Sequence, residues 1–249
     1  MRLLIIPDLH GVSSWKEQVV RAALHKEMHI IFLGDYLDSY VFNTHQIITN
    51  LEEIIELKKK LPDRITLLLG NHEYAYIFKK FNTSGTIAHM YTPYYNLLQR
   101  NIKLFDIAWG HTGPNGYTLV THAGLTQHFY DSIVSAIKAN DSSFSRYVNS
   151  LDKHWETLPL HELLNYVKND ESLLWKVGLN RGGISKTGSI IWADKRELLY
   201  DAYPGIDQIV GHTYSPYVDI HKVNRRTIYF TDTHDEDNNK VVGTFLSLE

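Results

Sequence analysis

Three short apolar segments in the first 70 residues each end in polar residues of the kinds that bind metal ions. The segments 2–7, 29–33 and 64–69 have the length of strands, and their near-continuous Ile, Leu and Val content is typical of strands covered on both faces. The segments between them, 15–26 and 44–60, repeat apolar residues at helical spacing. This order of strand, helix, strand, helix and strand predicts a layered α/β domain.

The chain after residue 121 follows a different pattern. A fourth apolar strand is expected at 117–121, and residues 127–186 are helical in character with scattered aromatics and no clear strand. We expect residues 127–186 to be a helical cap inserted into a single domain that spans 1–249. Short strands are expected again at 208–210, 217–223, 227–231 and 241–248, with the spacing of an antiparallel run.

Five of the expected strands end in a cluster of polar residues and glycine. The carboxyl ends of strands in an open α/β sheet are where ligands bind, so residues far apart in sequence meet there. A single cluster of this kind is commonly a turn, but burying five of them without a metal ion costs much free energy. The clusters read DLHG (8–11), GDYLD (34–38), GNHE (70–73), THAG (121–124) and VGHT (210–213).

The amino-acid composition argues against several other kinds of site. The chain has no cysteine, which excludes disulfides, thiolate nucleophiles and sulfur-ligated metals. Its 25 basic and 28 acidic residues give a net charge of −3, so no broad nucleic-acid-binding surface is expected. The apolar N-terminal segment is too short for a signal sequence or a membrane span, and we expect a cytoplasmic protein that does not contact a membrane.

The five clusters resemble the signatures of the calcineurin-like metallophosphoesterases, in particular the phosphoprotein phosphatase branch with its serine/threonine phosphatases and diadenosine tetraphosphatases. The signatures read PDLHG, GDYLDSY, GNHE, HAGL and GHTY, and the resemblance extends from residue 7 to about residue 235. It implies a layered α/β/β/α sandwich of two mixed sheets flanked by helices. It also implies two divalent metal ions, with Mn²⁺ first and Fe, Zn²⁺ or Ni²⁺ as alternatives.

The resemblance also assigns roles to residues. It implies that Asp8 and His10 hold one metal ion, that Asn71, His122 and His212 hold the other, and that Asp35 bridges both. A hydroxide shared by the metals then attacks the phosphorus of a phosphate monoester, carried by a protein or a small molecule. His72 is implied as the general acid that protonates the leaving oxygen, and Asp38 as the residue that orients His72.

The sequence departs from this family at a position that matters for substrate binding. Ser39 occupies the place of an arginine that binds phosphate, and a serine hydroxyl cannot supply its charge. We expect another basic residue to take this role, with Arg181 first and Lys195 or Arg196 as alternatives, while Asn71 also contacts the substrate. Pro7 and Ala123 are milder departures. Five histidines match no signature position and are expected to be surface or packed residues: His111, His154, His161, His221 and His234.

Two other functions fit the same residues. A dinucleoside polyphosphate pyrophosphohydrolase of the diadenosine tetraphosphatase kind shares the signatures, and its substrate would use the cap. A protein that binds metal without catalysis would share the fold, although no expected ligand is missing from the sequence. No pattern in the sequence specifies an oligomeric state.

Overall fold

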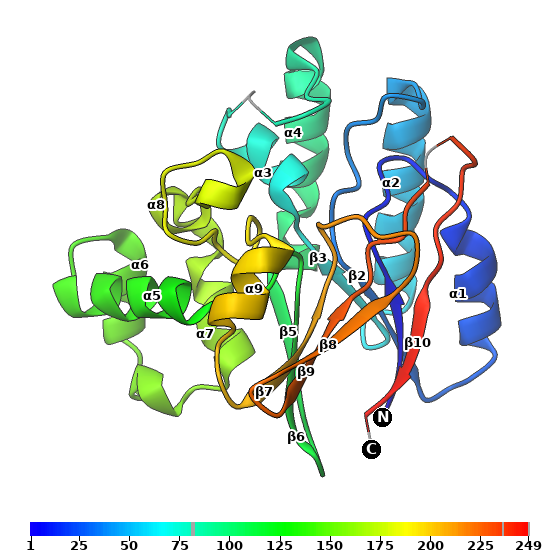
Figure 1. The fold of residues 1–249 in the computed structure, drawn as a ribbon. Coiled ribbons are helices and arrows are strands. Elements are labelled where there is room, and N and C mark those ends of the chain that lie inside the picture. The colour runs from blue at the N-terminus through cyan, green and yellow to red at the C-terminus, as the bar shows by residue number, and fades with distance from the viewer. Residues whose placement is uncertain (81–82, 236, 249) are drawn as a thin grey trace. The chain divides into compact units, whose positions relative to one another are not determined.

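Each half of the fold is built on its own five-stranded sheet. The computed structural model describes residues 1–80, 83–235 and 237–248 and divides into two compact units. Unit 1 comprises Met1–Asp106, Tyr214–Asp219 and Thr231–Glu249, and unit 2 comprises Ile107–Thr213 and Ile220–Phe230. Both sheets are mixed and both are flanked by helices (Figure 1), which confirms the expected fold class at this level.

The sheet of unit 1 contains the first three expected strands side by side. Its order is β10-β1-β2-β3-β4, with β1 to β4 parallel and β10 antiparallel to β1 at the edge. Because β1, β2 and β3 are parallel neighbours, their carboxyl ends lie at one edge of the sheet. The strands are β1 (Arg2–Ile6), β2 (Met28–Phe32), β3 (Ile65–Leu68), β4 (Phe105–Asp106) and β10 (Thr244–Ser247).

The helices of unit 1 are α1 (Trp15–Ala23), α2 (Thr44–Lys60), α3 (Asn71–Ile77) and α4 (Tyr91–Asn101). Helix α2 has the expected bounds because Asn43 caps it by accepting from the Gln46 amide, while a strip of apolar side chains buries its inner face. Helix α1 ends earlier than expected. Its buried residues are Trp15, Val19 and Ala22, whereas Val20 is 65% exposed.

The sheet of unit 2 has the order β5-β6-β7-β9-β8. The expectation of an antiparallel run was wrong here, because β7 pairs in parallel with both β6 and β9. Asn224 and Arg225 form a two-residue turn with positive φ between β8 and β9, so the chain reverses once and β9 returns in the direction of β7. The strands are β5 (Ala108–Gly113), β6 (Gly116–Thr121), β7 (Ile206–Val210), β8 (Asp219–Val223) and β9 (Arg226–Phe230).

Residues 127–186, all of them described, contain helices and no strand. The helices of unit 2 are α5 (Gln127–Ala139), α6 (Ser143–Asn149), α7 (Leu160–Tyr166), α8 (Glu171–Leu174) and α9 (Lys195–Asp201). That this segment caps a single domain stays a prediction. Short 3-10 helices lie at Ala88–Met90, Ile102–Leu104, Trp155–Thr157, Val167–Asn169 and Leu179–Arg181. Among the described residues, no helix combines the length and apolarity needed to traverse a lipid bilayer.

Candidate functional site

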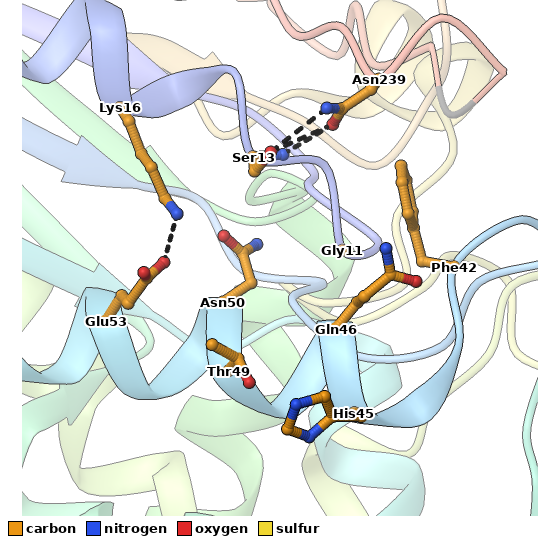
Figure 2. Close-up of a pocket in the computed structure, with 10 residues that line it drawn as sticks. All are labelled: Gly11, Ser13, Lys16, Phe42, His45, Gln46, Thr49, Asn50, Glu53 and Asn239. Carbon is orange, nitrogen blue, oxygen red and sulfur yellow. Dashed lines mark hydrogen bonds and ion pairs between the residues drawn. The ribbon is translucent and has the colours of Figure 1, made fainter.

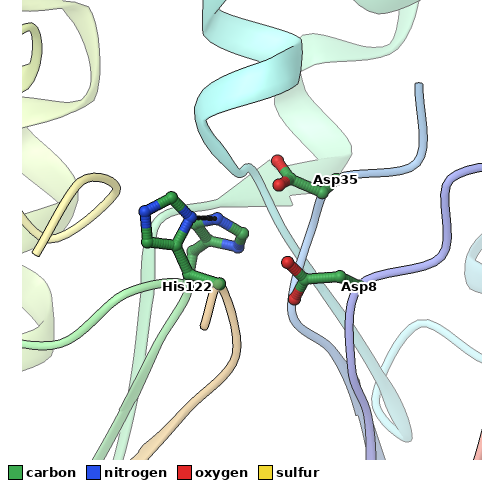
Figure 3. A group of neighbouring side chains, drawn as sticks. Asp8, Asp35 and His122 are labelled. Carbon is green, nitrogen blue, oxygen red and sulfur yellow. Dashed lines mark hydrogen bonds between the residues drawn. The ribbon is translucent and has the colours of Figure 1, made fainter. Parts of the chain in front are cut away.

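In unit 1, the parallel strands bring the expected ligands of three sequence clusters to one edge of the sheet. Asp8 follows β1, Asp35 follows β2, and Asn71 begins α3 directly after β3. All three are buried, with 2 to 3% of their surface exposed. The carboxylates of Asp8 and Asp35 point to the same side of the strand ends (Figure 3), and ligand oxygens of the two lie within 4.8 Å of each other.

The backbone at this edge adopts conformations that ordinary residues avoid. Among the described residues, nine other than glycine have positive φ, and four of them are candidate site residues: His10, Asp35, Asp38 and His212. Such conformations cost about 1–3 kcal/mol each and persist where the surrounding structure holds them. Gly34 has a φ of 107°, and a Cβ atom there would lie 2.4 Å from the Gly70 nitrogen. The ends of β2 and β3 therefore approach so closely that only glycine fits between them.

The tautomer of His10 is fixed by two backbone carbonyls. Its Nδ1 lies 3.0 Å from the Leu37 oxygen and 3.1 Å from the Asp38 oxygen, and a carbonyl only accepts hydrogen bonds, so Nδ1 carries the proton. The lone pair is then on Nε2, which lies 3.8 Å from a carboxylate oxygen of Asp35. A neutral imidazole held by a backbone oxygen at its other nitrogen is the arrangement of a metal-binding histidine.

Glu73 organises the loop that carries Asp35. Its Oε1 accepts from the amides of Tyr36 and Leu37, and its Oε2 accepts from those of Asp35 and Gly70, at 2.8 to 3.2 Å. The side chain is fully buried. Burial and the Asp35 carboxylate raise the pKa of Glu73, while the backbone amides that donate to it act in the opposite direction. Glu73 thus shapes the site through the backbone.

His72 and Asp38 form a buried pair in unit 1. His72 Nδ1 lies 2.9 Å from Asp38 Oδ2, and His72 Nε2 lies 3.9 Å from Asp35 Oδ2. Burial alone would disfavour a protonated His72, but the Asp35 carboxylate and the hydrogen bond to Asp38 outweigh it and raise the pKa of His72 to about 9. In the absence of a metal ion the raised pKa favours the protonated imidazole, and Nε2 is on the side where Asp35 lies.

The donors of unit 1 fit a divalent cation. Two buried carboxylates and an imidazole with its lone pair on Nε2 are ligands that Mn²⁺, Fe and Zn²⁺ accept. Two neighbouring carboxylates at 2% exposure repel each other unless a cation offsets their charge. His10, Asp35 and His72 also offer ligand atoms within 4.8 Å of one another, so His72 is a second candidate for the ligand set.

In unit 2, two strand ends bring the remaining expected histidines together. His122 follows β6 and His212 follows β7, and these strands are parallel neighbours. The Gly211 amide donates to the His122 carbonyl at 2.7 Å, which fixes one loop against the other. His122 Nε2 lies 3.1 Å from His212 Nδ1, and Trp192 contacts the His212 ring edge-on at 5.9 Å between centroids. Two imidazoles that face each other in this way are a suitable pair of ligands for one metal ion.

The candidate phosphate-binding residues in unit 2 differ sharply in exposure. Arg181 donates to the His212 carbonyl at 3.2 Å and to the Thr213 hydroxyl at 2.6 Å, and its Nε lies 3.1 Å from Asp194 Oδ2. Its side chain is 27% exposed, whereas that of Arg196 is 68% exposed. Burial alone would raise the pKa of Asp194, but hydrogen bonds from Arg196 and the charge of Arg181 lower it. Arg181 is therefore the arginine that lies against the His212 loop.

The remaining basic candidate, Lys195, places its amine 5.2 Å from the centroid of the Phe230 ring. Asn71 and Ser39 belong to unit 1, and Ser39 accepts from the amides of Val41 and Phe42 at 3.0 Å. Ser39 thus stabilises its own loop, as serine commonly does in a turn.

One histidine assigned to the surface or packed class lies beside a candidate ligand. The ring of His234 is 5.0 Å from that of His10, and its Nδ1 lies 2.8 Å from Asp232 Oδ1. His234 sits in the segment TDTH after β9, which matches none of the five signatures. The aspartate two residues before it was the only signal in the sequence that pointed to an oriented imidazole.

A pocket elsewhere in unit 1 contains none of the expected metal ligands. It measures about 270 Å³ and is lined by residues of α1 and α2 and by the loop residues Gly11, Ser13, Phe42 and Asn239. Figure 2 shows an ion pair between Lys16 and Glu53 on one side and hydrogen bonds between Ser13 and Asn239 on another. Each of these four residues thus has a polar partner within the pocket.

Comparison with known proteins gives a consistent result. A profile of the family described as calcineurin-like phosphoesterase matches residues 1–216. A serine/threonine-protein phosphatase of Caenorhabditis elegans is 28% identical over 132 residues, which are 50% of this chain and 27% of that protein. The catalytic subunit of serine/threonine-protein phosphatase 6 of Drosophila melanogaster is 29% identical over 122 residues, covering 48% of this chain and 38% of that protein. The chain thus spans well under half the length of these curated relatives.

Solved structures agree in fold. A protein serine/threonine phosphatase of Saccharomyces cerevisiae, with similarity to human phosphatase PP5, has a TM-score of 0.50 at 14% identity. The match covers 93% of this chain and 67% of the chain of that phosphatase. A cold-active protein-tyrosine phosphatase of a psychrophilic Shewanella has a TM-score of 0.50 at 15% identity. The match covers 100% of this chain and 80% of the chain of that phosphatase. At these identities the likeness concerns the fold alone.

Proposed function

Because the chain belongs to the calcineurin-like phosphoesterase family, we propose that it hydrolyses phosphate monoesters with the help of two divalent metal ions. The observation that carries this proposal is the edge of the sheet in unit 1. There the buried Asp8, His10 and Asp35 offer metal ligands next to the imidazole of His72, which is hydrogen-bonded to Asp38. The named serine/threonine phosphatases among the relatives support a phosphorylated protein or a small phosphate ester as the substrate.

We propose that Asp8, His10 and Asp35 hold one ion, and that Asp35, Asn71, His122 and His212 hold the other. When bound, the ions supply positive charge for the phosphate oxygens and lower the pKa of a water so that it can act as the nucleophile. The buried carboxylates and the Nε2 lone pair of His10 support this assignment in unit 1. The facing nitrogens of His122 and His212 support it in unit 2. Mn²⁺ remains our first choice of metal, and the cytoplasm our expected location.

His72 is proposed as the general acid. It donates its Nε2 proton to the leaving oxygen, while the Nδ1 proton stays in the hydrogen bond to Asp38. A pKa of about 9 keeps this proton available at neutral pH. Asp38 itself is 1% exposed, so its charge acts on His72 with little screening by water.

Arg181 is proposed to bind the phosphate in place of the arginine that Ser39 replaces. Its guanidinium is held by Asp194 and by the backbone carbonyl of His212, which fixes its position while part of the group stays accessible. A planar guanidinium can bind two phosphate oxygens at once.

The test is hydrolysis of p-nitrophenyl phosphate by purified protein with added Mn²⁺. We expect turnover that a chelator abolishes, and we expect Asp35→Asn to reduce kcat by more than about 10³-fold because the shared carboxylate is lost. Asp152→Asn is the matched control, since Asp152 is exposed on unit 2 and its loss should change kcat less than twofold, a change of about 0.4 kcal/mol.

Two outcomes would redirect the proposal. Metal-independent turnover at an equal rate would contradict it. Hydrolysis of a dinucleoside polyphosphate far faster than any monoester would favour the pyrophosphohydrolase, and metal binding without turnover of either would favour a non-catalytic scaffold.

A further inference from the structure

Helix α3 brings two polar side chains to the same buried carboxylate. His72 and Tyr76 are four residues apart, so they lie on one face of the helix. His72 Nδ1 binds Asp38 Oδ2, and the Tyr76 hydroxyl donates to the other oxygen, Asp38 Oδ1. Asp38 therefore receives one hydrogen bond on each oxygen from a single helix.

The direction of the hydrogen bond from Tyr76 follows from its surroundings. The Ile87 amide donates to the Tyr76 hydroxyl at 3.1 Å, so the hydroxyl accepts there and donates its own proton to Asp38, whose carboxylate only accepts. Burial, together with the charge of Asp38, raises the pKa of Tyr76 well above its usual range, so the phenol keeps that proton. Tyr76 is fully buried, and Tyr94 packs edge-on against its ring with centroids 5.0 Å apart.

A carboxylate held at one oxygen only can rotate about its Cβ–Cγ bond and share its charge with other donors. In Asp38 that rotation would move Oδ2 away from His72 and leave the imidazole free to turn. The hydrogen bond from Tyr76 opposes this rotation, and its buried position excludes water from Oδ1.

We infer that Tyr76 is a positioning residue for proton transfer: by holding Asp38, it fixes the ring of His72 with Nε2 directed at the leaving oxygen. This inference rests on the proposed role of His72. Only the Nε2 proton moves, from His72 to the oxygen of the breaking P–O bond, while Tyr76 keeps its proton throughout. Tyr76 lies three residues beyond the GNHE signature, and nothing in the five signatures points to it.

The test compares phosphate esters whose leaving groups differ in basicity. An alkyl phosphate leaves as a strongly basic alkoxide and needs the proton, whereas p-nitrophenolate leaves with little help. In Tyr76→Phe we expect kcat for an alkyl phosphate to fall about tenfold, and kcat for p-nitrophenyl phosphate to change by less than about threefold. KM for both esters and the Mn²⁺ content should stay as in the wild type. A change of ring contacts alone would not produce a loss that depends on the leaving group.

Tyr94→Phe is the matched control. Tyr94 is also fully buried in unit 1, and its hydroxyl makes no hydrogen bond within the described residues. We expect this variant to treat both esters alike. Circular dichroism before the assay checks that both variants are folded.

A double-mutant cycle gives a second, independent readout. If Tyr76 acts through His72, then Tyr76→Phe in a His72→Ala background should not slow the alkyl ester further. Equal losses on both esters, no loss on the alkyl ester, or an additive loss in the cycle would each overturn the role of Tyr76. Wild-type protein without activity on either ester would instead overturn the proposed function.

Discussion

Among the described residues, each unit contains one buried glutamate that accepts backbone amides of a loop at or next to candidate site residues, and the two glutamates do so differently. Glu73 in unit 1 receives two backbone amides on each carboxylate oxygen. Glu197 in unit 2 receives the amides of Gly188 and Asp194 on Oε2, and on Oε1 only the side chain of Asn180 at 3.3 Å. Both carboxylate oxygens of Glu73 therefore accept backbone amides in unit 1, whereas in unit 2 only Oε2 of Glu197 does so.

This difference matches what each loop is proposed to do. The loop of unit 1 carries Asp35 and Asp38, which must hold their partners at bonding distance. The loop of unit 2 adjoins Arg181, which must bind a phosphate group that arrives and leaves. We therefore expect changes in unit 1 to lower kcat and changes around Arg181 to raise KM.

The largest effect within this comparison is expected for His72→Ala. Removing the general acid should lower kcat by roughly 10²–10⁴-fold while both metal ions remain bound. Metal analysis of the purified variant checks the second part. Loss of metal together with activity would identify His72 as a ligand, as its distance to Asp35 permits.

The pH profile of the wild type gives a further readout of the same residue. Asp35 and Asp38 raise the pKa of His72, which favours the protonated acid at neutral pH, so kcat should fall as the pH rises above neutral. This alkaline limb should be absent from His72→Ala. A limb that persists unchanged in the variant would point to a different group.

A smaller effect, on KM, is expected for Arg181→Ala. The guanidinium binds ground state and transition state alike if its task is to hold phosphate, so KM should rise roughly tenfold with kcat within about threefold. Arg196→Ala is the control, because its side chain is 68% exposed and its KM should stay within about twofold. Steady-state kinetics and inhibition by inorganic phosphate measure both. If Arg181→Ala changed kcat more than KM, the expectation that changes in unit 1 lower kcat while changes around Arg181 raise KM would be wrong.

The smallest effect is expected for the glutamates themselves. In Glu73→Gln the new amide group faces two backbone donors whichever way it is turned, so the free energy of unfolding should fall by about 1–3 kcal/mol. In Glu197→Gln the amide can occupy the Oε1 side next to Asn180, and the loss should stay below about 1 kcal/mol. Chemical denaturation of both variants measures the difference, and equal losses would mean that the two loops are held alike.

Much of unit 1 could be predicted from the sequence, because its signals are local. The apolar runs that became β1, β2 and β3 stand out from their surroundings, and each ends directly in its polar cluster. Strand β5 was missed, since Ala108–Gly113 includes Trp, His, Thr and two glycines and has no apolar run. The parallel pairing of β7 with β9 was missed because it depends on a hairpin at Asn224 and Arg225 and not on either strand's own residues.

The candidate site residues also fall into those that local sequence predicts and those that it does not. Asp8, His10, Asp35 and Asn71 were predictable because a strand end fixes each of them. The ring contact of His234 with His10 and the hydrogen bond of Tyr76 to Asp38 were not, since each joins segments far apart in sequence without a motif. The roles of all these residues stay predictions until the variants are assayed.

The pairing of β10 with β1 has a consequence for the newly made chain. Strand β1, which carries Asp8 at its end, has β2 on one side and β10 on the other, and β10 (Thr244–Ser247) lies far from β1 in the sequence. During synthesis on the ribosome, β1 therefore stays an open edge until residues 244–247 have emerged. Exposed strand edges are prone to pair with other chains, so β1 presents an edge open to such pairing in any nascent or truncated chain that lacks β10.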